Sequence, residues 1–98
     1  MEVSFRDATL DRLETDPRFD GGYGAAIVKA FRKRIQFIRA AEDQRACYEM
    51  KSLHFEKLKG AREHQYSMTL NDQWRLILEL DDSGLEKLVH VVSIEDYH

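Results

Sequence analysis

The sequence contains a single cysteine, Cys47, so no disulfide can form within the chain and no metal site can consist of thiolates alone. Its neighbours Ala46 and Tyr48 favour a semi-buried thiol. No apolar run is long enough to cross a membrane, and the first residues lack the hydrophobic stretch of a signal peptide. These absences predict a cytoplasmic protein without a membrane partner.

Glycine is also scarce, with five residues, of which Gly21, Gly22 and Gly24 lie close together. They predict a flexible connection and not a phosphate-binding loop, because the preceding strand and the following Lys-Ser/Thr pair are missing. No pair of histidines has metal-ligand spacing with a third ligand nearby, so we expect neither a metal nor a small-molecule cofactor. A chain of 98 residues allows one domain, residues 1–98, with a single modest core.

Positive charge is outweighed overall, since the formal net charge is -3, but its distribution is uneven. Residues 29–62 hold ten Lys and Arg against four Asp and Glu, so this segment carries +6 and the remainder carries -9. A basic middle within an acidic chain predicts a local anionic partner. The alternative is that these Lys and Arg residues only solvate a helix face.

Helical spacing of apolar residues dominates the first half of the chain. Leu10 and Leu13 predict a helix over residues 7–14 that ends before Pro17, after a short opening strand at residues 3–5. A longer helix is predicted over residues 25–41, where one stripe is apolar. That stripe consists of Ile27, Val28, Phe31, Ile35 and Ile38. Residues 45–63 predict a short helix or turn followed by an irregular basic stretch.

The spacing changes to a period of two from Tyr66 onward. Strands are predicted at residues 66–70, 74–80 and 88–94, with turns at Asn71-Asp72 and at residues 81–84. Three strands joined by tight turns form an antiparallel meander, and the two earlier helices can cover one of its faces. The fold class is therefore α+β. Trp74 and Leu76 should face the helices, which places Arg75 on the opposite, open face, where it can meet a phosphate.

Three segments together resemble the HigB toxins of the larger RelE/ParE toxin–antitoxin superfamily. They read LHFEKLKG at residues 53–60, YSMTLNDQWRL at residues 66–76 and IEDYH at residues 94–98. The resemblance covers nearly the whole chain in element order and is sharpest from residue 53 to the end. It implies a microbial ribonuclease-like fold, in which two main N-terminal helices pack on one face of a small curved antiparallel sheet.

The same resemblance implies a function and partners. Such toxins enter the ribosomal A site and cut messenger RNA there, and a helix-turn-helix antitoxin, HigA, neutralises them and represses the shared operon. Carried onto matching positions, the catalytic residues are His54, Asp96, Tyr97 and His98. The residues implied to contact RNA phosphates are Arg75, Lys57, Lys59 and Arg62. The sequence departs from many HigB toxins where Phe55-Glu56-Lys57 separates His54 from Leu-Lys-Gly.

The chemistry of these residue types suits RNA cleavage without a metal. A base must take the proton of the ribose 2′-OH, an acid must protonate the leaving 5′-oxygen, and cations must stabilise the phosphorane. His54 and His98 can supply the proton-transfer pair, with Asp96 orienting one of them and Tyr97 donating a proton or stacking on a base. The α-carboxylate of His98 should favour its imidazolium form and hence the role of acid.

Each of these residues also has a purely structural interpretation. Residues at a chain end are often frayed and inert, Tyr97 can simply pack over the edge of the core, and His54 can be a packing histidine. His64 should be exposed, and His90 should lie within the sheet on the face of Leu88. Two other functions also fit the resemblance: a ParE-like toxin that binds DNA gyrase without cutting RNA, and a degenerate toxin that acts only with its antitoxin in operon regulation.

Overall fold

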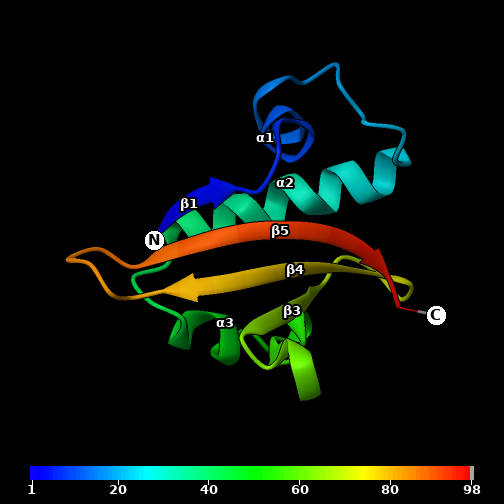
Figure 1. Ribbon diagram of the computed structural model, residues 1–98. Helices are drawn as coiled ribbons and strands as arrows, with labels where there is room; N and C mark the ends of the chain where they lie inside the picture. Colours follow the sequence, from blue (N-terminus) through cyan, green and yellow to red (C-terminus); the bar gives the residue numbers. More distant parts are fainter. Residues whose placement is uncertain (98) are drawn as a thin grey trace.

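The computed structural model describes residues 1–97 and joins five strands into one sheet beside the two longest helices (Figure 1). The strands are β1 (Glu2–Phe5), β2 (Glu56–Lys57), β3 (Gln65–Thr69), β4 (Trp74–Asp81) and β5 (Leu88–Asp96). The helices are α1 (Ala8–Thr15), α2 (Ala25–Ala40) and the short α3 (Arg45–Glu49), with 3₁₀ turns η1 (Lys51–Leu53) and η2 (Gly60–Arg62). The α+β class and every strand and helix predicted from periodicity are confirmed.

The sheet has the order β1-β5-β4-β3-β2. Strands β3, β4 and β5 form the predicted antiparallel meander, whereas β1 pairs with β5 in parallel. The interpretation of residues 45–63 as a helix or turn followed by an irregular stretch needs one correction, because Glu56 and Lys57 pair with Ser67 and Tyr66 as strand β2. Two residues are too few to show a period of two, and their pairing depends on the backbone of β3.

The N-terminal helices begin and end at residues that suit those places. The side chain of Asp7 accepts a hydrogen bond from the backbone N–H of Leu10 at 2.9 Å, which caps α1, and the helix ends two residues before Pro17. Helix α2 buries its predicted apolar stripe, and its Arg34 donates to the carbonyl of Thr69 at the end of β3. The contact from Arg34 ties α2 to the end of β3 in the sheet.

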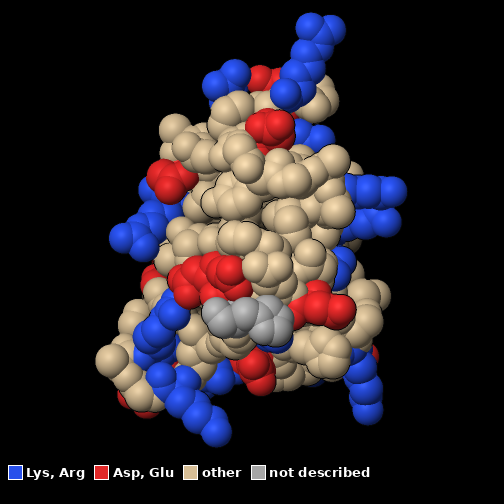
Figure 2. Space-filling model, turned by 90° about the vertical axis from the view of Figure 1, so that its right-hand side faces the viewer, with Lys and Arg blue, Asp and Glu red and all other residues tan. Residues whose placement is uncertain are grey.

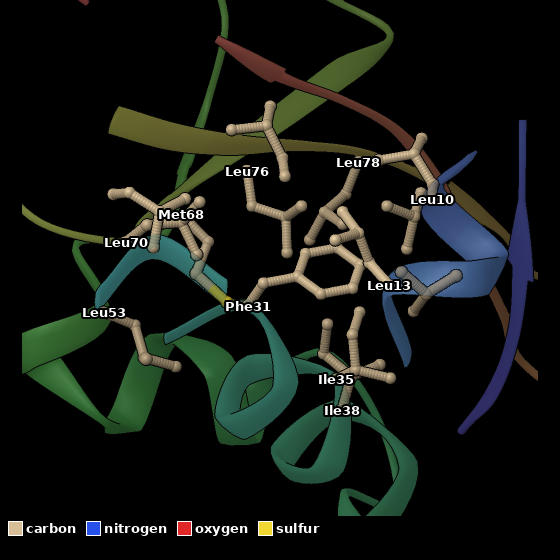
Figure 3. Packing of buried hydrophobic residues seen from close by; sticks show 14 of the residues in the cluster. Leu10, Leu13, Phe31, Ile35, Ile38, Leu53, Met68, Leu70, Leu76 and Leu78 are labelled. Carbon is tan, nitrogen blue, oxygen red and sulfur yellow. The ribbon is translucent and has the colours of Figure 1, made fainter. Parts of the chain in front are cut away.

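The core lies between these helices and one face of the sheet (Figure 3). Phe31 of α2 is fully buried, with Leu13 of α1 on one side and Leu76 and Leu78 of β4 on another (Figure 3). Cys47 joins the same cluster and is 2% exposed, so it is more deeply buried than predicted. Burial raises the pKa of its thiol to about 11. Within residues 1–97, no helix is both long and apolar enough to span a membrane.

The opposite face of the sheet is less open than the alternation of β4 predicted. Ile77 points to this face but is fully buried. Arg62 donates to Gln65 on β3 at 2.9 Å and to Glu95 on β5 at 2.8 Å. Because β4 lies between β3 and β5, the Arg62 side chain crosses β4 over Ile77. The long side chains of charged residues thus cover an apolar centre that a period of two alone would leave exposed.

Candidate active site

The end of β5 is held against the turn between β3 and β4. The backbone N–H of Tyr97 donates to the carbonyl of Gln73 at 2.8 Å, and the Gln73 side chain donates to Asp96 at 2.9 Å. Asn71 shapes this turn by accepting hydrogen bonds from the backbone N–H groups of Gln73 and Trp74. Asp96 and Tyr97 therefore occupy defined positions beside the turn. His98, the last residue of the predicted trio, lies outside the described residues.

Arg75 lies beneath the Tyr97 ring and holds several groups together. Its guanidinium donates to the Ser67 hydroxyl and to the carbonyl of His54, both at 2.7 Å. The guanidinium carbon lies 5.1 Å from the centre of the Tyr97 ring, which is a cation–π contact. A carboxylate oxygen of Glu56 lies 3.5 Å away.

The burial of Arg75 bears on its predicted contact with RNA phosphate. The side chain is only 14% exposed, and its Nε is buried without a hydrogen-bond partner among residues 1–97. The prediction that Arg75 points away from the helices is confirmed by the register of β4. The expectation of a wet, freely accessible arginine is not, because Tyr97 and residues 54–56 cover it. Arg75 therefore has a positioning role irrespective of any phosphate that it contacts.

A hollow of about 350 Å³ lies beside Tyr97 and is lined by two of the four predicted RNA-contacting residues, Lys57 and Lys59. It is lined by Glu56, Lys57, Leu58, Lys59 and Tyr97. The Tyr97 side chain is about half exposed, so the part of its ring that faces the hollow can accept a stacked base. Figure 2 views the end of the molecule where β5 finishes and shows acidic side chains near its middle with basic ones towards the rim. The surface is thus mixed in charge, and Lys57 and Lys59 are exposed on the wall of the hollow, where a phosphate can reach them.

Arg62, which was also predicted to contact phosphate, is paired with a carboxylate in this structure. It forms a bidentate ion pair with Glu95, which also accepts a hydrogen bond from Ser93 at 2.7 Å. The hydrogen bonds from Arg62 lower the pKa of Glu95. Arg62 must exchange this carboxylate for a phosphate if it contacts RNA.

The ion pair between Arg62 and Glu95 should make the stability of the fold depend on pH. Because the pKa of Glu95 is lower in the folded state, the pair stabilises the fold above the ordinary glutamate pKa, and this stabilisation is lost as pH falls through the folded value. Arg62→Gln should lower the free energy of unfolding at pH 7 by less than about 1 kcal/mol, since both groups are partly exposed. Urea unfolding from pH 7 to about pH 2 should show the difference vanish in acid. A difference that stays constant over this range would contradict the assignment.

Three histidines, His54, His64 and His90, lie in different parts of the structure. His54 ends η1 with a left-handed backbone, φ 47° and ψ 47°, a conformation in which histidine is enriched. Its carbonyl binds Arg75, but its exposed side chain does not line the hollow. His64 is exposed, as predicted, and lies 3.7 Å from Glu79. His90 lies within the sheet, as predicted, with its Nδ1 2.7 Å from the Ser4 hydroxyl.

Three residues of the site were not singled out from the sequence: Glu56, Ser67 and Gln73. Ser67 is fully buried and accepts a hydrogen bond from Arg75, and the register between β3 and β4 places both side chains on the same face of the sheet. The only sequence feature that could have pointed to Glu56 was its position next to Lys57. For Gln73 that feature was its place in the turn between the predicted strands. Within residues 1–97, no group of three His, Cys, Asp or Glu residues is arranged to hold a metal ion.

A family model described as "RelE-like toxin of type II toxin-antitoxin system HigB" matches residues 3–97. The chain belongs to this HigB-like toxin family. The match confirms the resemblance drawn from residues 53–60, 66–76 and 94–98. No sequence among the curated proteins matches the chain.

Solved structures of related toxins share the fold of this HigB-like chain. A YoeB/ParE toxin from Agrobacterium tumefaciens has a TM-score of 0.62 at 19% identity, with all of both chains covered. The YoeB–YefM complex from Staphylococcus aureus has a TM-score of 0.62 at 18% identity, covering 100% of this chain and 97% of the other. YafQ from E. coli strain BL21(DE3) has a TM-score of 0.61 at 11% identity, covering 98% and 92%. At these identities the likeness establishes the fold alone.

Proposed function

We propose that this HigB-like toxin is an endoribonuclease that cuts messenger RNA on the ribosome and thereby inhibits translation. The observation that carries the proposal is the hollow beside Tyr97, where a carboxylate, two lysines and an aromatic ring surround a space large enough for a nucleotide. The Arg75 guanidinium lies against the same ring. These groups supply a proton acceptor and the cations that cleavage at a ribose 2′-OH requires, together with a surface on which a base can stack.

The proton acceptor that we propose is Glu56. It lines the hollow, its side chain is 59% exposed, and it lies within 3.5 Å of Arg75. Its carboxylate would take the proton of the 2′-OH while the 2′-oxygen attacks phosphorus. The bond between phosphorus and the 5′-oxygen then breaks, which leaves a 2′,3′-cyclic phosphate and a 5′-hydroxyl. His54, a catalytic residue implied by the resemblance, is the alternative base, although its carbonyl is the group that contacts Arg75.

The leaving 5′-oxygen needs a proton, and we assign this role to His98. Asp96, held by Gln73, would orient or ionise its histidine neighbour, and Tyr97 would stack on the base next to the cut. Lys57 and Lys59 would neutralise the phosphate on the wall of the hollow, with Arg75 and Arg62 as second contacts. The proposed chemistry uses side chains alone.

We further propose two partners and a compartment. The substrate would be messenger RNA in the ribosomal A site, which places the protein in the cytoplasm. The second partner would be a HigA-like helix-turn-helix antitoxin that neutralises the toxin and represses their shared operon. Membership of a type II toxin family supports an antitoxin partner, and the solved YoeB–YefM complex is a toxin of this fold with a second protein.

Induction in bacteria, followed by primer extension on translated messenger RNA, tests the function. The wild-type chain should arrest growth and create new 5′ ends within coding sequences, whereas His98→Ala and Asp96→Ala should each reduce cleavage by about 100-fold or more. Growth arrest without new 5′ ends, unaffected by either substitution, would defeat the nuclease proposal and favour a target such as DNA gyrase. Cleavage of free RNA without ribosomes would contradict the proposal that cleavage depends on the ribosome. If the chain causes no growth arrest, no new 5′ ends and no cleavage of free RNA, a role in operon regulation with the antitoxin remains.

A further inference from the structure

A second group of cations lies outside the candidate active site, in a groove between α2 and the loop that follows α1. The groove has a volume of about 360 Å³. The charged residues that line it are Arg18, Asp20, Lys29, Arg32 and Lys33. None of them lines the hollow beside Tyr97. The basic middle of the sequence therefore divides into two separate surfaces, and the proposed RNA cleavage uses only one of them.

Arg32 builds one wall of the groove, and its Nε and Nη2 are engaged by backbone carbonyls of the chain. Its guanidinium donates to the carbonyls of Leu13 at 2.8 Å, Asp16 at 2.9 Å and Phe19 at 3.3 Å. These bonds occupy carbonyls at the end of α1 and tie the following loop to α2. The groove is consequently held in shape by a partly buried network within the chain.

The remaining cations point to an anionic ligand. Lys29 and Lys33 are four residues apart on α2, so they lie on one face of the helix about one turn from each other. Both are exposed, as is Arg18 on the opposite rim. Within residues 1–97, neither lysine takes part in an ion pair. Their charges are thus free to meet carboxylates or phosphates.

The rest of the lining decides between these two kinds of anion. It includes the apolar residues Pro17, Phe19, Ala25 and Val28. A nucleic acid would use an aromatic residue here as a stacking surface, but the guanidinium of Arg12 already lies 4.2 Å from the centre of the Phe19 ring. Apolar side chains rimmed by lysines instead match an apolar side chain flanked by carboxylates, which is the pattern of an acidic amphipathic helix.

We propose that this groove is a docking site for an acidic amphipathic helix of a partner protein. An apolar side chain of that helix would lie on Ala25 and Val28, and carboxylates on its flanks would pair with Lys29, Lys33 and Arg18. Phosphate-rich RNA is the competing occupant. The proposal concerns a surface separate from the hollow and does not require RNA cleavage.

A titration of the full chain, labelled with ¹⁵N, tests it with a short synthetic helical peptide as the probe. The peptide carries leucines along one face and glutamates on both flanks. Backbone amides within residues 18–36 should shift, and the double variant Lys29→Glu/Lys33→Glu should weaken peptide binding about tenfold or more. Both lysines are exposed, so the variant should keep the wild-type melting temperature. Unchanged affinity in the folded double variant would overturn the proposal.

Matched controls separate this surface from the candidate active site. Lys57→Glu/Lys59→Glu carries the same charge change on the other cationic surface, so it should keep peptide binding while RNA cleavage falls. Lys29→Glu/Lys33→Glu should lose peptide binding while RNA cleavage stays at the wild-type level. A peptide with lysine in place of every glutamate should not bind. Equal binding of that basic peptide, or a short RNA duplex shifting amides 18–36 at lower concentration than the acidic peptide, would also overturn the proposal.

Discussion

Replacing Arg75 with alanine is expected to impair both the fold and the proposed activity. Arg75 satisfies the buried Ser67 hydroxyl and the His54 carbonyl, so Arg75→Ala leaves two acceptors without a donor. The free energy of unfolding should fall by about 1–3 kcal/mol, because the Ser67 hydroxyl is fully buried and an unsatisfied buried polar group costs about 1–3 kcal/mol, whereas the His54 carbonyl is exposed to water. Messenger RNA cleavage should fall by about 100- to 1,000-fold, since Tyr97 loses its cation–π partner and the site loses a charge. Urea unfolding and primer extension measure the two effects.

Arg75→Lys is the control that separates charge from positioning. A lysine keeps the positive charge but has no planar fork with which to bind two acceptors while stacking on a ring. If Arg75 mainly positions Tyr97 and residues 54–56, the lysine variant should lose nearly as much cleavage as the alanine variant. If it acts mainly as a charge on the phosphate, most of the cleavage should return with lysine. Wild-type stability and cleavage in Arg75→Ala would contradict both roles.

Glu56→Gln should have the largest effect on cleavage with the least effect on stability. The substitution keeps the size of the side chain and removes the carboxylate that we propose as the base, so cleavage should fall by about 100- to 10,000-fold. Glu56 is 59% exposed and belongs to a two-residue strand, so the free energy of unfolding should change by less than about 0.5 kcal/mol.

His54→Gly tests the competing assignment of the base. Glycine adopts the left-handed backbone of this position readily and keeps the carbonyl that Arg75 binds, while the imidazole is removed. We expect near-normal cleavage in this variant if Glu56 is the base. A large loss in His54→Gly together with normal cleavage in Glu56→Gln would reverse the assignment and make His54 the base. Both variants should be folded, which circular dichroism checks.

Much of the fold could be predicted because its signals are local. The stripe of Ile27, Phe31 and Ile35 predicts a helix without knowledge of its neighbours, and the structure has α2 over nearly the predicted range. The alternation around Arg75 predicts which face it points to, since side chains alternate along any strand. The two-residue strand β2 escaped prediction because two residues have no period.

The site was predictable only where the resemblance supplied its members. Lys57, Lys59 and Tyr97 were named from it, and the structure brings all three to one hollow. Glu56 was named only as part of the segment that separates His54 from Leu-Lys-Gly. Its contact with Arg75 spans the pairing of β2, β3 and β4, which no local pattern encodes.

The sequence by itself determined the family, the α+β class and the faces on which most side chains lie, because motifs and periodicity are properties of short segments. Only the tertiary structure decided which groups meet. Arg75 lies under Tyr97, Arg62 crosses the sheet to Glu95, and the His54 carbonyl rather than its ring faces Arg75. These contacts join residues at least 21 positions apart, so they follow from strand register and packing. The physical reason is that a charged side chain takes whichever partner the folded backbone brings within reach.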